Sequence, residues 1–220
     1  MTDASQHPAA GDALAELVAV MDRLRTECAW KASQTHESLM RFLVEEAYEV
    51  VDAVETGTAD DLREELGDLL LQVVFHARVA EEGPAGRTPF GIADVAAGIT
   101  EKLRRRNPHV FGSDDVTGLP SIDRTDAAAV NERWEQVKAA EKPERDSVLD
   151  GIAPALPALA TAQKVIERLE RAGEVPDPAG DGVGEQLWAV VRRAHAEGVD
   201  PEQALRQVVR AMAAEQPDAP

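Results

Sequence analysis

Two short clusters of carboxylates have the residue types and spacing that could do chemistry. The first is Glu45-Glu46-x-x-Glu49, and the second is Glu65-x-x-Asp68. On a helix with 3.6 residues per turn, residues three apart lie on the same side, so Glu46 adjoins Glu49 and Glu65 adjoins Asp68. Each cluster therefore presents at least two carboxylates from one helix face.

A water-exposed acidic face is the simple explanation for the first cluster. The second cluster does not fit that explanation, because its helix is apolar almost all round and is expected to be buried. Its apolar residues are Leu66, Leu69, Leu70, Leu71, Val73, Val74 and Phe75. An uncompensated buried carboxylate costs several kcal/mol. A cation is therefore expected beside Glu65 and Asp68.

Antiparallel packing of the two helices could bring Glu46, Glu49, Glu65 and Asp68 together. Four carboxylates without a thiolate or an obligatory histidine make an all-oxygen site, which suits Mg²⁺, or Mn²⁺, better than zinc. A di-iron carboxylate bundle would need Glu-x-x-His motifs, and neither cluster has a histidine at that position. The sequence therefore predicts a magnesium site, with Mn²⁺ as a possible replacement.

Further along the chain, basic residues gather just before a proline. They are Lys102, Arg104, Arg105 and Arg106, followed by His109. One explanation is a favourable interaction with the dipole of a helix C-terminus. The other is a clamp for a polyphosphate, in which arginine forks bind phosphate oxygens. The chain has no GxxxxGK[ST] loop, so it is not a P-loop nucleotide hydrolase.

Helical periodicity predicts four helices in the first part of the chain, at about residues 13–26, 37–55, 60–82 and 92–106. Gly57 is the expected stop of the second helix, and Thr58 with Asp61 is a capping signal for the third. A loop is expected around Gly83 to Pro89. Because the connections are short, the expected fold class is all-α, with a four-helix bundle.

The second part is expected to hold helices at about 127–142, 158–171 and 183–197, and one that begins after the N-cap residue Asp200. Residues 183–191 weakly resemble residues 66–74, by repetition or by chance. We therefore expect a disordered N-terminus (1–12), a catalytic helical domain (13–142), a linker with a helix (143–182) and a helical remnant of a second copy (183–214). Loops are expected at 112–123, 147–157 and 174–182.

Composition limits the function classes. Hydrophobic residues make up 44% and aromatics 4% of the 220 residues, which favours aliphatic helix packing over a β-sandwich. Lys and Arg total 23 against 41 Asp and Glu, and a net charge of −18 argues against nucleic-acid binding. The single cysteine, Cys28, suits a reducing cytoplasm. We expect no signal peptide, no membrane span and a cytoplasmic location.

These motifs resemble the MazG family of nucleoside triphosphate pyrophosphohydrolases. The segments 42–50 (FLVEEAYEV) and 64–70 (EELGDLL) are similar to its EExxE and ExxD signature. Segments 34–39, 102–112, 134–138 and 147–151 continue the resemblance in order, over about residues 13–172. The resemblance implies an all-helical, magnesium-dependent enzyme that converts a ribo- or deoxyribonucleoside triphosphate to a monophosphate and pyrophosphate.

The resemblance also implies residue roles and a homodimer, in which helices of two chains complete the bundle. Glu46, Glu49, Glu65 and Asp68 match the metal ligands, and Glu45 matches a residue that binds a second metal or orients the attacking water. Lys102, Arg105 and Arg106 match basic positions that hold the triphosphate. Trp134 and Lys138 match positions near the nucleotide.

The chain departs from the family pattern at several positions. The usual Cys-Pro-Trp-Asp reads Cys28-Ala29-Trp30-Lys31, and Phe42 stands where some active copies carry lysine. In the remnant, Gly182 and Glu185 replace the expected glutamate and aspartate, so it should not hold a metal. Two functions therefore stay open: an active pyrophosphohydrolase of the nucleotide pool, or a degenerate relative that dimerises or binds nucleotide for regulation.

Overall fold

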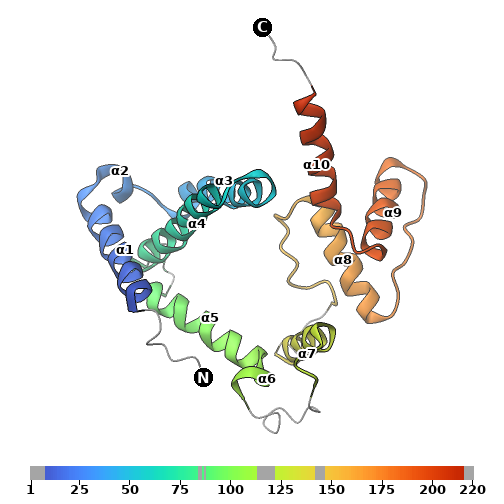
Figure 1. The fold of residues 1–220 in the computed structure, drawn as a ribbon, viewed down its shortest axis with the longest axis horizontal. Helices are drawn as coiled ribbons and strands as arrows, with labels where there is room; N and C mark the ends of the chain where they lie inside the picture. The colour runs from blue at the N-terminus through green and yellow to red at the C-terminus, as the bar shows by residue number, and fades with distance from the viewer. Residues whose placement is uncertain (1–7, 84–85, 87, 113–121, 142–146, 216–220) are drawn as a thin grey trace. The chain divides into compact units, whose positions relative to one another are not determined.

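A computed structural model describes residues 8–83, 86, 88–112, 122–141 and 147–215, which form two compact units. The first unit spans residues 1–134 and the second 135–220 (Figure 1). Across these described ranges the regular structure is helical, without a strand, and this confirms the all-α class. None of the described helices combines the length and apolar character needed to cross a membrane.

The first unit contains α1 (Pro8–Glu27), α2 (Ala29–Ala32), α3 (His36–Thr56), α4 (Ala59–Ala80), α5 (Ile92–Arg106) and α6 (Pro108–Phe111). The next helix, α7 (Ala127–Ala140), crosses the boundary between the units. The second unit contains α8 (Ala158–Ala172), α9 (Val183–Ala196) and α10 (Pro201–Ala214). The sequence predicted the longer helices to within a few residues, except that α1 begins at Pro8, and it missed the single-turn helices α2 and α6.

An antiparallel hairpin of α3 and α4 is the most extensive helix pair of the first unit. Its turn is tight because Gly57 closes α3: a Cβ there would lie 2.8 Å from the carbonyl oxygen of Ala53. The Thr58 hydroxyl accepts a hydrogen bond from the Asp61 amide, and the Asp61 carboxylate accepts one from the Thr58 amide. This reciprocal cap fixes where α4 begins.

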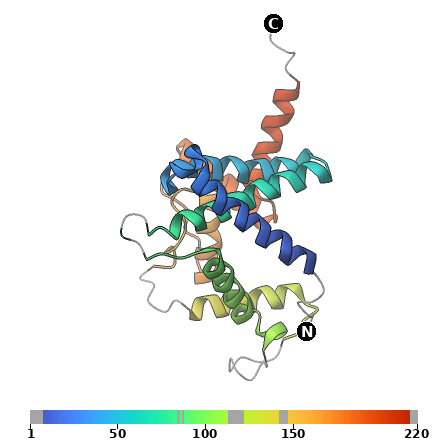
Figure 2. The same cartoon turned by 90° about the vertical axis from the view of Figure 1, so that its left-hand side faces the viewer.

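The core of this unit lies where α1 and α5 meet α4. Met21, Leu39, Val74, Phe75 and Val79 are fully buried there, and side chains of α1, α3, α4 and α5 pack around them. Figure 2 shows α1 crossing the α3–α4 hairpin. These contacts hold the hairpin from one side.

Buried Arg25 ties this core to the start of α3. Its guanidinium donates to both carboxylate oxygens of Glu82, at 2.9 and 2.8 Å, and to the carbonyl oxygen of Gln34 at 3.0 Å. A further hydrogen bond goes to the Lys31 carbonyl oxygen. Because one side chain joins α1, the segment before α3 and the residues after α4, the beginning of α3 is held firmly in place.

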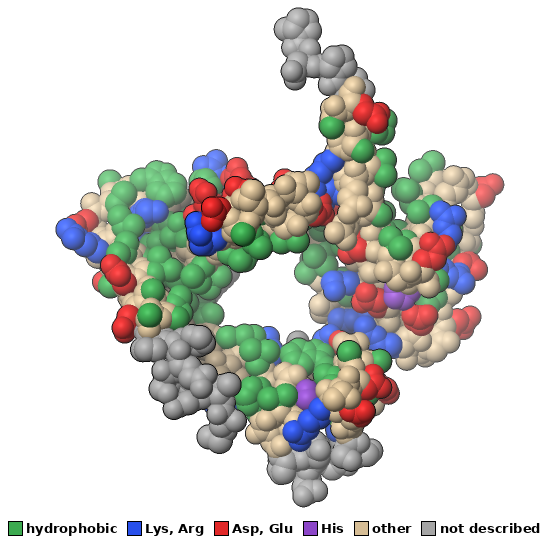
Figure 3. Space-filling model, in the orientation of Figure 1, with side chains coloured by type: hydrophobic (Ala, Val, Ile, Leu, Met, Phe, Trp, Pro, Cys, Tyr) green, Lys and Arg blue, Asp and Glu red, His purple; other side chains and the backbone are tan. Residues whose placement is uncertain are grey.

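The expectation that α4 is buried all round is wrong. Leu66, Leu70 and Val73 are 49%, 36% and 40% exposed, and they share one face of the helix. On α3, Met40 and Val44 are 56% and 54% exposed. The physical reason is that α1 and α5 cover only one side of the hairpin. Figure 3 shows further hydrophobic side chains at the surface over α1 and α5.

In the second unit, α8, α9 and α10 pack against one another. Among the residues described there, Ile166 of α8, Val191 of α9 and Pro201 of α10 are buried. The Asp200 side chain accepts a hydrogen bond from the Gln203 amide at 2.9 Å, so the predicted cap of α10 is confirmed. Parts of the predicted N-terminal tail (1–7), loops (84, 85, 87 and 113–121) and linker (143–146) lie outside the described residues.

Candidate metal centre

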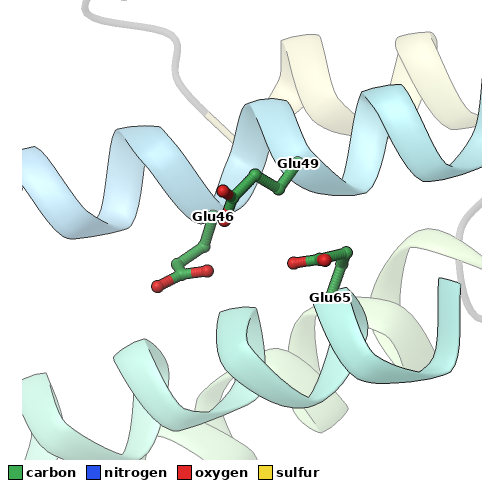
Figure 4. Close-up of side chains that lie close together, drawn as sticks. All are labelled: Glu46, Glu49 and Glu65. Carbon is green, nitrogen blue, oxygen red and sulfur yellow. The ribbon is translucent and has the colours of Figure 1, made fainter. Parts of the chain in front are cut away.

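Three carboxylates of the two acidic clusters converge between α3 and α4. Glu46 and Glu49 project from α3 and Glu65 from α4, and Figure 4 shows their side chains pointing into the same space. One carboxylate oxygen of each lies within 4.8 Å of the others. Two helices therefore present three oxygen donors to one point, as a hard divalent cation requires.

Asp68 and Glu45 lie outside this group of three. The charge of Asp68 nevertheless acts on both Glu46 and Glu65, so this carboxylate borders the centre. Glu45 is exposed and directly precedes Glu46, so its side chain points to a different side of the helix. The structure thus brings together three of the five predicted acidic residues and places a fourth beside them.

Crowding of negative charge changes the acidity of the centre. Burial, a hydrogen bond with Glu49 and the charges of Asp68, Glu49 and Glu65 raise the pKa of Glu46 to about 7. Burial and the neighbouring charges of Glu49 and Asp68 also raise the pKa of Glu65. These shifts mean that the ionised centre lacks a compensating positive charge, and a divalent cation would supply it.

We expect Mg²⁺ to stabilise the protein more at about pH 8 than at about pH 6, with an affinity loss of up to about tenfold per pH unit below 7. Because the pKa of Glu46 is raised above its ordinary value, stability without metal should fall as the pH rises toward 7. Mg²⁺ needs the ionised carboxylate, so its stabilising effect should rise over the same interval. Thermal unfolding in EDTA and in Mg²⁺ at both pH values measures the difference.

The matched control for this experiment is Glu46→Gln, which keeps the side-chain shape and removes the titration. Its unfolding temperature in EDTA should vary less with pH than that of the wild type. An equal Mg²⁺ effect at both pH values in the wild type would contradict a metal centre at these carboxylates.

Arg106 and Trp134, two of the residues assigned to the nucleotide, lie together. The Arg106 guanidinium stands 5.4 Å from the centroid of the Trp134 ring, in a cation–π contact. An aromatic ring with a guanidinium over one face can bind a base and a phosphate of one ligand. This pair is the part of the predicted substrate site that the structure brings together.

The other basic residues are placed differently. Exposed Lys102 and Arg105 lie near the end of α5, and Arg105 pairs with Glu101 on its own helix at 3.2 Å. In the second unit, Lys138 donates to Glu135 at 3.0 Å, and Glu135 also pairs with Arg171. Arg105 and Lys138 are thus each paired with a glutamate of their own helix.

A second polar group between α3 and α4 was missed by the sequence reasoning. His36 and His76 lie in contact, with their Nδ1 atoms 2.8 Å apart. Gln72, on the same face of α4, is buried. The signal was available, because the two histidines stand at nearly equal distances before and after Gly57, and an antiparallel hairpin pairs such positions.

Two of the departures from the family pattern, Lys31 and Phe42, serve packing. The Lys31 ammonium lies 5.3 Å from the Trp30 ring centroid and 5.2 Å from that of Phe75. Phe42 packs against the core and lies edge-on to Trp30, with ring centroids 6.0 Å apart. Both side chains thus take part in a cluster of aromatic rings near the start of α3.

Comparison with known proteins finds a family model and several relatives that match this chain. A family model described as the MazG nucleotide pyrophosphohydrolase domain matches residues 34–111, which include both acidic clusters and α5. The chain is 37% identical over 227 residues to the nucleoside triphosphate pyrophosphohydrolase/pyrophosphatase MazG of Thermotoga maritima. That match covers 91% of this chain and 83% of the relative.

Two further proteins are also similar. A Mycobacterium tuberculosis protein named nucleoside triphosphate pyrophosphohydrolase is 50% identical over 163 residues, which cover 74% of this chain and 46% of the relative. An uncharacterized 26.1 kDa protein of Streptomyces cacaoi is 48% identical over 198 residues, or 89% of this chain and 78% of that protein. The chain thus spans about half the length of the mycobacterial relative.

Proposed function

The chain belongs to the MazG family of nucleotide pyrophosphohydrolases, and from that premise we propose that it hydrolyses nucleoside triphosphates at the carboxylates of α3 and α4. The products are a nucleoside monophosphate and pyrophosphate, and the enzyme is a hydrolase of acid anhydrides. The observation that carries this proposal is the convergence of Glu46, Glu49 and Glu65 within 4.8 Å.

The proposed metal is Mg²⁺, which Mn²⁺ can replace, with Glu46, Glu49, Glu65 and Asp68 as its ligands. The donor set supports this choice, because all four side chains offer oxygen. A bound metal ion lowers the pKa of water and neutralises charge that develops on the leaving group. Glu45, exposed beside the ligands, is proposed to orient the attacking water or to bind a second ion.

The proposed substrate residues hold the phosphates and the nucleotide. Lys102, Arg105 and Arg106 bind phosphate oxygens, and Trp134 and Lys138 lie near the base and sugar. The contact between Arg106 and Trp134 supports this assignment, because a guanidinium held over an aromatic ring is pre-oriented for a ligand. The catalytic domain is proposed to span residues 13–142, and residues 183–214 are proposed to be a remnant of a second copy.

We propose that the active form is a homodimer. The exposed apolar face of the α3–α4 hairpin supports a second copy as its cover, because Leu66, Leu70 and Val73 lie in one row beside the carboxylates. A two-fold axis would pair this face with itself. Two hairpins packed in this way form a four-helix bundle, with both metal centres at the interface.

Hydrolysis in ¹⁸O-labelled water is the direct test of the reaction. The label should appear in the nucleoside monophosphate, because water attacks the α-phosphorus, and pyrophosphate should leave unlabelled. Turnover should require Mg²⁺ or Mn²⁺ and stop in EDTA. Product analysis by mass spectrometry and ³¹P NMR over a panel of nucleoside and deoxynucleoside triphosphates measures both points.

Orthophosphate and a nucleoside diphosphate as products would contradict the proposed cleavage position. Full activity in EDTA would contradict the metal centre. Tight binding of a triphosphate without turnover in Mg²⁺ would instead identify the chain as a nucleotide-binding relative that has lost catalysis.

A further inference from the structure

The contact between His36 and His76 has the geometry of a hydrogen bond between two rings. Their Nδ1 atoms are 2.8 Å apart, the ring planes differ by 5°, and the ring centroids are 5.1 Å apart. Nearly coplanar rings at this separation meet edge to edge. An N–H···N bond then requires that one Nδ1 carries a proton and the other does not.

This pair joins two parts of the α3–α4 hairpin that the acidic centre also uses. His36 is the first residue of α3, and His76 lies two turns beyond Asp68 on the same face of α4. At the centre itself, the carboxylates of the two helices repel each other. The hairpin therefore needs attractive contacts elsewhere to set the distance between its helices.

Packing alone does not account for these polar residues. Within the part of the chain that the structure describes, neither Gln72 Oε1 nor His76 Nε2 has a hydrogen-bond partner, although both atoms are buried. Buried polar atoms without partners cost stability, and apolar side chains of similar size would avoid that cost. The histidine pair thus supplies something that apolar residues lack: a directional bond that depends on protonation.

We propose that His36 and His76 form a proton-sensitive latch, which fastens the first turn of α3 to α4 and holds the two helices at the separation that the metal centre needs. This role rests on the proposed function, since it positions the carboxylates and does not touch the substrate.

The latch tolerates one added proton and not two. When one proton is added to the neutral pair, a charged His36 can still donate its Nδ1 proton to the unprotonated Nδ1 of His76. A second proton leaves no acceptor and places two positive charges in contact. Burial and the charge of His36 lower the pKa of His76. The stability that the neutral ring provides is therefore present above the ordinary histidine pKa of about 6.5 and lost as the pH falls through the lowered value.

The charged side chains described around this end of the hairpin include Asp22 and Arg25 of α1, Lys31 of α2, Glu37 of α3, Arg78 near the end of α4 and Glu82 just beyond it. They are engaged with other groups: Arg25 and Arg78 pair with Glu82, and Lys31 lies over the rings of Trp30 and Phe75. The charge that acts on His76 is that of His36.

NMR of the histidine ring nitrogens over pH, in the metal-free full-length chain, tests the latch directly. We expect His76 to titrate below the ordinary range and in step with a change at His36. The reference is His195, which contacts Glu170 at 2.8 Å in the second unit and is not part of the pair. A pKa of His76 at or above the ordinary value, with no linked change at His36, would overturn the proposal.

Mg²⁺ binding near neutral pH, measured by calorimetry with the metal alone, tests the positioning role. His76→Leu should weaken Mg²⁺ binding by about 3- to 30-fold, as expected for a coupled site. His76→Asn keeps a hydrogen-bonding atom near the position of Nδ1 and should bind Mg²⁺ within about twofold of the wild type. In His76→Asn, the part of the loss of Mg²⁺ affinity at acid pH that comes from His76 should also disappear. His195→Gln should bind Mg²⁺ like the wild type.

Wild-type Mg²⁺ affinity in His76→Leu, with unchanged pH dependence, would overturn the positioning role. If His76→Leu fails to fold, the Asn variant and the NMR titration still decide the question. A wild-type chain that binds no Mg²⁺ would contradict the metal centre and with it the positioning role, and the NMR titration would still decide whether the two rings share a proton.

Discussion

Replacing Glu49 or Asp68 with alanine is expected to lower turnover by about 10²- to 10³-fold or more, while the fold is kept. Each variant removes one oxygen donor from the centre and leaves the developing charge of the reaction less well neutralised. The fold should survive because the charges of these two residues raise the pKa of Glu46, so removing either relieves repulsion. Steady-state release of pyrophosphate in saturating Mg²⁺ measures the loss.

The matched control is Glu64→Ala. Glu64 is exposed and adjoins Glu65 in sequence, and it is not among the three converging carboxylates. This variant should keep turnover close to that of the wild type. Thermal unfolding in EDTA should show Glu49→Ala and Asp68→Ala at least as stable as the parent. Normal rates in both would mean that the acidic clusters are a solvated face without a catalytic role.

The acidic centre could be predicted from the sequence because its position depends on local rules. Glu46 and Glu49 share a helix face at their spacing, and Gly57 with the cap at Thr58 sets a short turn. Given that turn, antiparallel packing brings the two clusters to the same level. Periodicity, capping and turn length are all readable along the chain.

The covering of each helix could not be predicted in the same way. The apolar residues of α4 indicated burial all round, but α1 and α5 pack against only one side of the hairpin. The period of the apolar residues shows which side of a helix is apolar, but it does not show which other element packs against that side. The basic residues show the same limit, since Arg105 pairs within its own helix and Lys138 pairs with Glu135.

The exposed apolar face of α4 is the basis of a prediction about the oligomeric state. Leu70→Glu is expected to convert the proposed homodimer into monomers, with turnover lost at the same time. A two-fold interface contains the residue twice, and each new carboxylate buried there without a partner costs several kcal/mol. The dimer should therefore weaken by about 3–6 kcal/mol, or roughly 10²- to 10⁴-fold in the dissociation constant. Sedimentation equilibrium over a range of concentrations measures the shift.

A matched control separates the interface from a general effect of surface charge. Val208 on α10 is 55% exposed, and Val208→Glu introduces the same charge in the second unit. This variant should leave the oligomeric mass and the turnover rate unchanged. Leu70→Met, which keeps an apolar side chain of similar volume, should keep the dimer. If the wild-type chain is a fully active monomer, the exposed face of α4 serves another purpose. If Leu70→Glu stays dimeric, the two copies meet through a different surface, and the metal centre is complete within one chain.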